Sequence, residues 1–443
     1  MPRLKKIQAV NEDIRVVNNA SPVDLIPGDI FSSNLVLSKI HRVAQNFGYL
    51  RVETSPVEVM EFLESRHQLS DIKPDRYIHI DATSKKYGLR SHNFLSVLRA
   101  YSTGRVFERE KVTKWYYVEP AFNLDKNIVS HLYEFGIAHF GEPTSMSDAH
   151  LISMLKTLLE EFGINDVVFE INSKGCDTCL AYYQEVLSDF LQQNKYNFCA
   201  NCQKTFGREA VGCPHGEASG LWQVFNCAGE QCQSILDNAP QIIDHLDTPC
   251  NHHFTGLLET LDELEIPYQL NPKLFGSHWL SHTIFRVKVQ SAGSDIPRET
   301  NLGIGGRHNC FVSRITGQGI PTLAFSVPLS VLGNLVSGYG AAPKPERIAD
   351  VFLINLSELA AKKSLHLFLD LWKNHISCAE QFGENGIKNQ FKMAEKKGCP
   401  IALIVGQKEA LEDNVILRDV RSGIQEVFSY DRIVEEVRKR LQE

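Results

Sequence analysis

The sequence lacks both a long hydrophobic run and an excess of positive charge. None of its windows approaches the ~18 uninterrupted apolar residues that a membrane span requires, and no apolar segment typical of secretion signals precedes Asn11. The formal net charge is −7, so no global basic field points to nucleic acid. We therefore expect a cytoplasmic protein without DNA or membrane partners, in which any RNA contact would come from a local patch.

The chain has 443 residues, of which 43% are hydrophobic and 22% charged, which is typical of a globular protein with two or three domains. Helical periodicity and short apolar runs predict helices and antiparallel strands in residues 1–170 and 255–337, which we assign to one core domain. Residues 171–254 have a different, cysteine-rich character and are predicted to be an insertion. Residues 338–347 concentrate Gly, Ala and Pro as a linker, and residues 348–443 alternate strands and helices as a small α/β domain.

Cysteine spacing predicts a metal site in the insertion. Cys176 and Cys179 form one CxxC pair, and Cys199 and Cys202 form a second after nineteen residues, a spacing within the range of zinc ribbons. Structural zinc would then stabilise a segment too small for a core of its own, although free buried cysteines or a redox pair remain alternatives. A second possible metal set is Cys227, Cys232, Cys250 and His253, and Cys213 and His215 are spare potential ligands.

The stretches "GLRSHNFLSVLRAY", "KWYYVEPAF", "INSKGCDTC", "GIGGRHN" and "IALIVGQKEALEDNVILRDVRSG" follow one another along the chain. In their residues and spacing they resemble bacterial histidyl-tRNA synthetases over nearly the whole length of the chain. The resemblance implies an α+β fold, with a class II aminoacyl-tRNA synthetase antiparallel sheet core, a zinc-binding insertion and a C-terminal α/β domain of the anticodon-binding type. It also implies a homodimer.

Several positions that bind substrate in that family carry other residues here. His92 stands where the resemblance implies a glutamate that faces the substrate amine, and Asn123 stands for the arginine that grips the α-phosphate. Asp125 keeps a carboxylate that is one methylene shorter. Each lost charge-assisted contact would typically cost ~1.5–3 kcal/mol.

Further along the chain, other positions that bind substrate in that family also carry different residues. Glu134 stands for a glutamine, and Ala138 for the glutamate that recognises the imidazole of histidine. Phe275 replaces the catalytic arginine, Trp279 a tyrosine, and Val331 the second ATP-binding arginine. The resemblance, read at these positions, therefore predicts a protein that cannot form histidyl-adenylate and for which ATP and Mg²⁺ are not expected as cofactors.

The expected function is that of a catalytically degenerate paralogue that binds tRNA or a protein partner. Lys388, Lys392 and Lys396 are spaced to share one helix face and could contact phosphates, or form an ordinary solvated face. One alternative is the regulatory subunit of ATP phosphoribosyltransferase, although those proteins usually lack the C-terminal domain. Another is an active, divergent ligase with a rebuilt site, for which the histidines near the old pocket are candidates: His92, His131, His278, His282 and His308.

Overall fold

The computed structural model describes most of the chain, namely residues 27–67, 78–81, 85–125, 128–205, 224–275, 279–290, 299–339, 349–382 and 386–442. The chain divides into two compact units, Met1–Ala342 and Pro343–Glu443. None of the helices in these ranges combines the length and the apolar content needed to cross a membrane.

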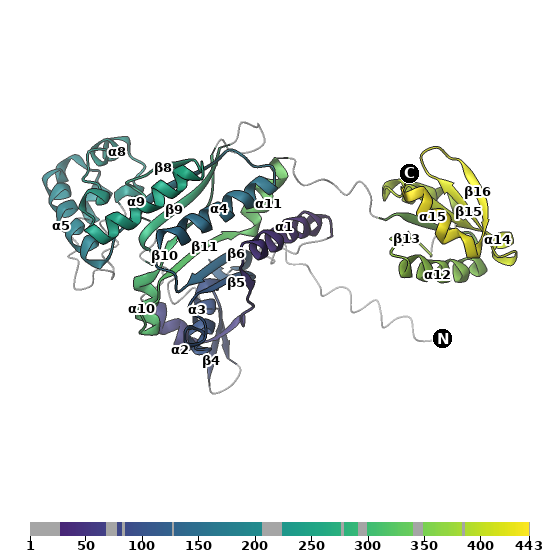
Figure 1. The fold of residues 1–443 in the computed structure, drawn as a ribbon, viewed down its shortest axis with the longest axis horizontal. Helices are drawn as coiled ribbons and strands as arrows, with labels where there is room; N and C mark the ends of the chain where they lie inside the picture. The colour runs from purple at the N-terminus through teal and green to yellow at the C-terminus, as the bar shows by residue number, and fades with distance from the viewer. Residues whose placement is uncertain are drawn as a thin grey trace, which may run out of the picture. The chain divides into compact units, whose positions relative to one another are not determined.

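An eight-stranded sheet organises the first unit, with the strand order β1-β5-β6-β11-β10-β9-β7-β8 (Figure 1). All neighbouring pairs are antiparallel except β1 with β5 and β7 with β8. The strands are β1 Leu50–Arg51, β5 Thr113–Asp125, β6 Ile128–Phe140, β7 Val167–Ser173, β8 Tyr268–Leu270, β9 Ser281–Gln290, β10 Glu299–Arg307 and β11 Thr322–Pro328. The antiparallel strands predicted from the sequence are present, but β5 and β6 are longer than their apolar stretches indicated, because polar residues continue the pairing to Asp125 and Ile128.

Side chains alternate between the two faces of this sheet, as in any strand, and the faces are covered differently. On the core face, which carries Tyr116, Phe135, Ile137 and Leu323, helices contribute to one large apolar cluster. These helices are α1 Pro27–Asn46, α4 Ser145–Glu161, α9 Thr248–Glu263 and α11 Leu329–Gly338. On the pocket face, which carries Tyr117, Glu134, Ala138 and Ala324, a separate aromatic-rich cluster includes residues of α3 Asn93–Thr103 and α10 Asn309–Thr316.

A small three-stranded sheet with the order β2-β4-β3 lies next to the start of α3 in the chain. Its elements are β2 Val57–Val59, β3 His79–Asp81 and β4 Lys86–Leu89, with α2 Met60–His67 between β2 and β3 and the 3-10 turn η2 Val106–Glu108 after α3. Between α1 and β2, only the two residues of β1 form a strand.

The cysteine-rich segment is mostly helical and gathers at one end of the sheet (Figure 1). Its elements are α5 Asp177–Gln193, η3 Lys195–Asn197, α6 Ala200–Thr205, η4 Val224–Asn226, α8 Glu230–Leu236 and η5 Ile242–His245. The expectation that this segment is too small for a core is wrong, because Leu180, Tyr183, Leu187 and Leu191 on one face of α5 pack with Phe198 and others into a buried cluster of their own.

The second unit is the small α/β domain predicted from the sequence. Its sheet has the order β13-β12-β14-β15-β16, in which β13, β12 and β14 are parallel and β15 and β16 are antiparallel. The strands are β12 Val351–Asn355, β13 Cys378–Glu380, β14 Ile401–Val405, β15 Asn414–Asp419 and β16 Gln425–Ser429. The helices are α12 Glu358–Lys373, α13 Ile387–Lys396, α14 Gln407–Leu411 and α15 Ile433–Gln442, with η6 Tyr430–Arg432 before α15.

Candidate functional site

A pocket of about 230 Å³ opens on the pocket face of the eight-stranded sheet. The start of α3, the strands β5, β6, β10 and β11, and the chain before β9 all contribute to its wall. The described lining residues are His92, Asn93, Phe94, Tyr117, Glu134, Trp279, Leu280, Ile304, Phe325, Ser326, Ala324 and His308. Among them, Glu134 is the one carboxylate, and there is no lysine or arginine.

The structure brings four of the residues singled out in the sequence into this pocket: His92, Glu134, Trp279 and His308. Ala138 lies beneath it, fully buried, in register with Ala324 on β11. Phe275 does not line the pocket. Its ring stacks on Tyr183 and Phe225 in the apolar cluster of the cysteine-rich segment.

Val331 also lies away from the pocket, on α11, where it packs against the large core cluster. Asn123 and Asp125 lie on β5, but their side chains fall outside the described residues, as does that of His131. His278, Cys213 and His215 likewise lie in ranges that the structure does not describe. The positions of these residues in the site therefore stay predictions.

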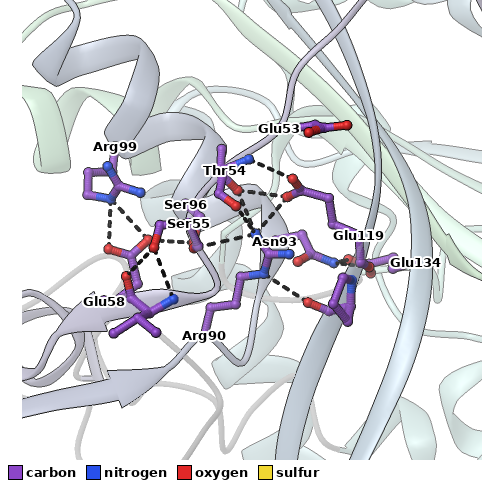
Figure 2. A network of polar contacts seen from close by, with 12 residues as sticks. Glu53, Thr54, Ser55, Glu58, Arg90, Asn93, Ser96, Arg99, Glu119 and Glu134 are labelled. Atoms are coloured by element: carbon purple, nitrogen blue, oxygen red, sulfur yellow. Dashed lines mark hydrogen bonds and ion pairs between the residues drawn. The ribbon is translucent and has the colours of Figure 1, made fainter.

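Two glutamates face each other across β5 and β6 beside the pocket, because Glu119 and Glu134 are register partners. Glu119 is saturated: its Oε2 is 2.7 Å from Nη1 of the buried Arg90, and its Oε1 accepts from the backbone amide of Thr54 at 2.6 Å (Figure 2). The same Nη1 donates to Thr54 Oγ1 at 2.7 Å, and Nε donates to the carbonyl of Pro120 at 2.8 Å. These two nitrogens of the guanidinium thus bind the protein scaffold.

Glu134 has only neutral hydrogen-bond partners. Its Oε2 accepts from Asn93 Nδ2 at 3.0 Å, and its carboxylate also accepts from Ser326. Burial raises the pKa of Glu134, and these two hydrogen bonds together with the charge of Arg90 oppose that shift without cancelling it. The pocket therefore contains a carboxylate for which the described residues provide no directly paired cation.

Asn93 and Tyr117 complete the polar floor of the pocket. Asn93 is fully buried, and its amide nitrogen donates to Glu134 and to the carbonyl of Glu119 at 3.1 Å, which fixes the orientation of the amide. Its Oδ1 has no hydrogen-bond partner. Tyr117 can lie across β6 only because residue 136 is glycine, since a Cβ there would be 2.1 Å from the tyrosine Cζ.

His308 also lines the pocket, where the centroid of its ring lies 4.8 Å from that of Phe94. Burial lowers the pKa of His308 to about 3, with the nearby Lys174 contributing and a hydrogen bond to the backbone of Trp279 opposing. The ring is therefore neutral at pH 7, and its Nδ1 is buried without a partner. His282, on β9, is similarly neutral, since burial lowers its pKa to about 4.

The core face holds a different ionic arrangement. Arg307 and Asp148 are both almost completely buried, and the guanidinium Nε lies 3.0 Å from Asp148 Oδ2. The remaining guanidinium donors reach the carbonyls of Thr144 and Glu142 at 2.7 and 2.9 Å. This pair is satisfied within the protein and fixes the start of α4 to the end of β10.

Two groups of side chains in the cysteine-rich segment could hold metal ions, each with its ligand atoms within 4.8 Å of one another. The first contains Cys176, Cys179, Asp247 and Cys250. Cys176 Sγ is 3.6 Å from Cys179 Sγ and 3.2 Å from Asp247 Oδ2. Asp247 also caps α9, accepting from the amide of Cys250 at 2.8 Å, so the cluster joins the starts of α5 and α9.

The second group contains Cys199, Cys202, Cys227 and Cys232. Cys199 Sγ is 3.9 Å from Cys227 Sγ, and the amide of Cys199 donates to Cys232 Sγ at 3.3 Å. The grouping expected from the sequence is therefore corrected: the two CxxC pairs lie in separate clusters, because α5 separates them and each folds against a different later segment.

His253 is not in either cluster, because its Nε2 faces Asp148 Oδ2 at 3.5 Å on the core side. Asp247 was missed in the sequence. A signal was present, since "DTP" before an apolar helix is a typical N-cap with proline in the first turn.

Comparison with known proteins identifies the family. The family model for histidyl-tRNA synthetase matches residues 23–331, more than half of the chain. The chain belongs to the histidyl-tRNA synthetase family. The anticodon binding domain model matches residues 350–440, and the class II synthetase-like fold with a C-terminal anticodon-binding domain, expected from the sequence, is confirmed.

Individual relatives agree with this assignment. The histidine–tRNA ligase of Thermodesulfovibrio yellowstonii is 28% identical over 424 residues, which cover 93% of this chain and 97% of that protein. The histidine–tRNA ligase of Dehalococcoides mccartyi strain 195 is 26% identical, with 94% and 98% covered.

Solved structures share the fold. The apo histidyl-tRNA synthetase of S. aureus matches with a TM-score of 0.76 at 21% identity. The match covers 94% of this chain and 97% of the S. aureus chain. A Bacillus halodurans protein described as an ATP phosphoribosyltransferase regulatory subunit/histidyl-tRNA synthetase matches with a TM-score of 0.63 at 14% identity, covering 88% and 98%.

Proposed function

We propose that this chain is a histidyl-tRNA synthetase-family protein that acts by binding tRNA or a protein partner and does not form histidyl-adenylate. The observation that carries this proposal is the pocket, whose described lining contains no lysine or arginine. Adenylate formation places negative charge on phosphate oxygens and needs cations to stabilise it. A pocket lined by Phe94, Trp279 and Ala324 offers no such stabilisation.

The size of the pocket supports the same proposal. Its volume of about 230 Å³ is below the ~300–1,000 Å³ of sites that hold drug-sized ligands. Arg90, whose charge acts on Glu134, is buried and bound to Glu119, Thr54 and Pro120. Its Nη1 and Nε therefore bind the protein rather than a phosphate.

We also propose that both cysteine clusters bind structural zinc. Four thiolates in one cluster, and three thiolates with one carboxylate in the other, are ligand sets that tetrahedral zinc accepts. The ions would be held by Cys199, Cys202, Cys227 and Cys232, and by Cys176, Cys179, Asp247 and Cys250. Zinc would link segments distant in sequence.

A tRNA partner is supported by the anticodon binding domain match at residues 350–440. Lys388, Lys392 and Lys396 are exposed on α13 in that unit, one helical turn apart, and are proposed to contact phosphates. By analogy with the family, we propose a homodimer.

Two other functions stay open. The Bacillus halodurans neighbour, whose title includes a phosphoribosyltransferase regulatory subunit, favours a regulatory role. The anticodon binding domain match at residues 350–440 favours tRNA binding instead. A divergent active ligase is favoured by the names of the relatives.

The deciding experiment is ATP–pyrophosphate exchange with histidine and then the other amino acids, beside an active histidine–tRNA ligase. We expect exchange at background, since nothing in the described pocket would stabilise the phosphates. Exchange above background with any amino acid would show a rebuilt active site and overturn the proposal.

Elemental analysis of the same preparation should give two zinc ions per chain, and less than one would contradict the zinc assignment.

A further inference from the structure

The pocket offers hydrogen-bond acceptors that the protein itself does not use. Asn93 Oδ1 is fully buried and unpaired, and its orientation is fixed because the amide nitrogen donates to both glutamates. An unpaired buried acceptor destabilises a fold, so one that persists at a pocket wall points to a ligand that donates to it. Figure 2 shows Asn93 lying between Glu119 and Glu134.

His308 provides a second acceptor in the lining of the pocket. Its ring interacts with the backbone of Trp279, while its Nδ1 is buried and unpaired. Because a neutral imidazole that donates from one nitrogen accepts at the other, Nδ1 is available to a ligand N–H. Together with Glu134, the pocket thus has three acceptors and, among its described residues, no cationic donor.

The two opposed glutamates determine the charge that such a ligand should carry. Glu119 has Arg90 at 2.7 Å, whereas Glu134 receives hydrogen bonds from Asn93 and Ser326. Like charges directly opposite on neighbouring strands destabilise a sheet. The charge of Arg90 reduces that repulsion, but its hydrogen bonds go to Glu119, Thr54 and Pro120, so a ligand cation beside Glu134 would reduce it further.

The walls fit the rest of the ligand. Phe94, Tyr117 and Trp279 line the pocket with aromatic surface, and aromatic faces attract organic cations. The edge of one ring in the His92–Trp279 pair meets the face of the other, with the centroids 5.1 Å apart, and the far side of Trp279 is stacked on Phe311 at 4.4 Å. These contacts hold the indole in place before any ligand binds.

We propose that this pocket binds a small organic cation that carries no carboxylate or phosphate, such as a primary amine or a guanidine. The volume of about 230 Å³ exceeds the ~150 Å³ cavity that binds benzene, so a single ring with an aminoalkyl chain fits. The proposal rests on the proposed loss of adenylate chemistry, because a site for amino acid and ATP would need cations for their anionic groups. Glu134, Asn93 and His308 bind the ammonium, and the aromatic walls bind the carbon skeleton.

The test compares amines with the amino acids that differ from them by one carboxylate. Histamine against histidine, and agmatine against arginine, are titrated into the full-length protein by calorimetry, with tryptophan fluorescence as a second readout because Trp279 lines the pocket. We expect each amine to bind about ten-fold or more tightly than its amino acid. Equal or tighter binding of the amino acids, or no saturable binding of either amine at millimolar concentration, overturns the proposal.

A variant pair locates the binding. Glu134→Gln keeps the shape and should weaken histamine binding about ten-fold, while Glu185→Gln, at an exposed position on α5, should leave it unchanged. If Glu134→Gln fails to fold, the comparison of amine and amino acid on the natural protein still decides. Amine binding together with pyrophosphate exchange would refute the proposed function and leave the amine site standing, whereas background exchange without amine binding would do the reverse.

Discussion

The two faces of the eight-stranded sheet differ in how their buried polar and charged side chains are paired. On the core face, Arg307 and Asp148 are buried together, and the donors of the guanidinium also meet backbone carbonyls at the start of α4. On the pocket face, Asn93 and His308 keep acceptors that have no partner among the described residues, and Glu134, which accepts from Asn93 and Ser326, has no lysine or arginine beside it in the described lining. The difference shows that the buried charges of the core face are paired within the protein, whereas acceptors in the pocket are available to a ligand.

The largest effect is expected from a substitution of Asp148. We expect Asp148→Asn to lower the free energy of unfolding by about 3–5 kcal/mol, because Arg307 would remain buried without its counter-charge. Urea denaturation followed by circular dichroism measures this change. The matched control on the same helix is Glu160→Gln, whose partner Lys156 is partly exposed, and it should change stability by no more than about 0.5 kcal/mol. Similar effects from both variants would mean that the core-face pair is not a structural requirement.

On the pocket face, Gly136→Ala sharpens the comparison by closing the pocket from below. The added Cβ would lie 2.1 Å from Tyr117 Cζ, so the buried tyrosine must move, which we expect to cost about 1–3 kcal/mol of stability and to abolish histamine binding. Calorimetric titration and thermal unfolding give both values. Gly333→Ala on α11, where a Cβ meets nothing within 4 Å, is the control and should retain binding. A Gly136→Ala protein that binds histamine normally would contradict the assigned pocket floor.

A pH-dependent effect concerns His139 on the core face, since both of its ring nitrogens are buried and have no partner among the described residues. Burial, first, and then the charge of Lys114 lower its pKa to about 4. The unfolded chain therefore gains a proton near pH 6.5 that the folded protein takes up only near pH 4, so stability is full above pH 6.5 and falls as the pH drops. The groups that face His139 are Tyr49, Lys114, Glu142, His150 and Arg307.

The slope expected from His139 is about 1.4 kcal/mol per pH unit between pH 6.5 and 4. His139→Gln should remove about one proton from the pH dependence of unfolding measured by denaturant titration. The control His366→Gln replaces an exposed histidine on α12 and should leave the slope within error of the natural protein. An unchanged slope in His139→Gln would mean that this ring is not kept neutral by the fold.

Much of the fold could be predicted from the sequence because its signals are local. The apolar spacing of α1 and α9 and the alternation of β12, α12, β14 and β15 follow from periodicity within each element. The length of β5 and β6 could not, because the polar ends of these strands are stabilised by pairing with each other rather than by an apolar pattern. The core of the cysteine-rich segment was missed because Leu180, Tyr183, Leu187 and Leu191 on α5 are buried by short later segments and by Phe275, whose packing no local pattern indicates.

The pocket was only partly predictable. His92, Glu134 and Trp279 were found through the resemblance of their surroundings, and all three line the pocket. Asn93 stands next to His92 in the same stretch, yet its importance depends on the orientation of its amide between two glutamates, which no sequence pattern encodes. Gly136 likewise looks like an ordinary strand glycine until Tyr117 is seen to cross it.

The sequence by itself determined the kinds of chemistry available: a chain that belongs to the histidyl-tRNA synthetase family, thiols in pairs, and aromatic or neutral residues where the family resemblance implies charges. Only the tertiary structure decided which groups meet. It placed the two CxxC pairs in separate clusters, brought Asp247 to one of them, and gave Arg90 to Glu119 rather than to Glu134. The physical reason is that spacing along a chain fixes how many ligands or charges lie near one another locally, whereas the partners of a buried group come from whichever distant segments pack against it.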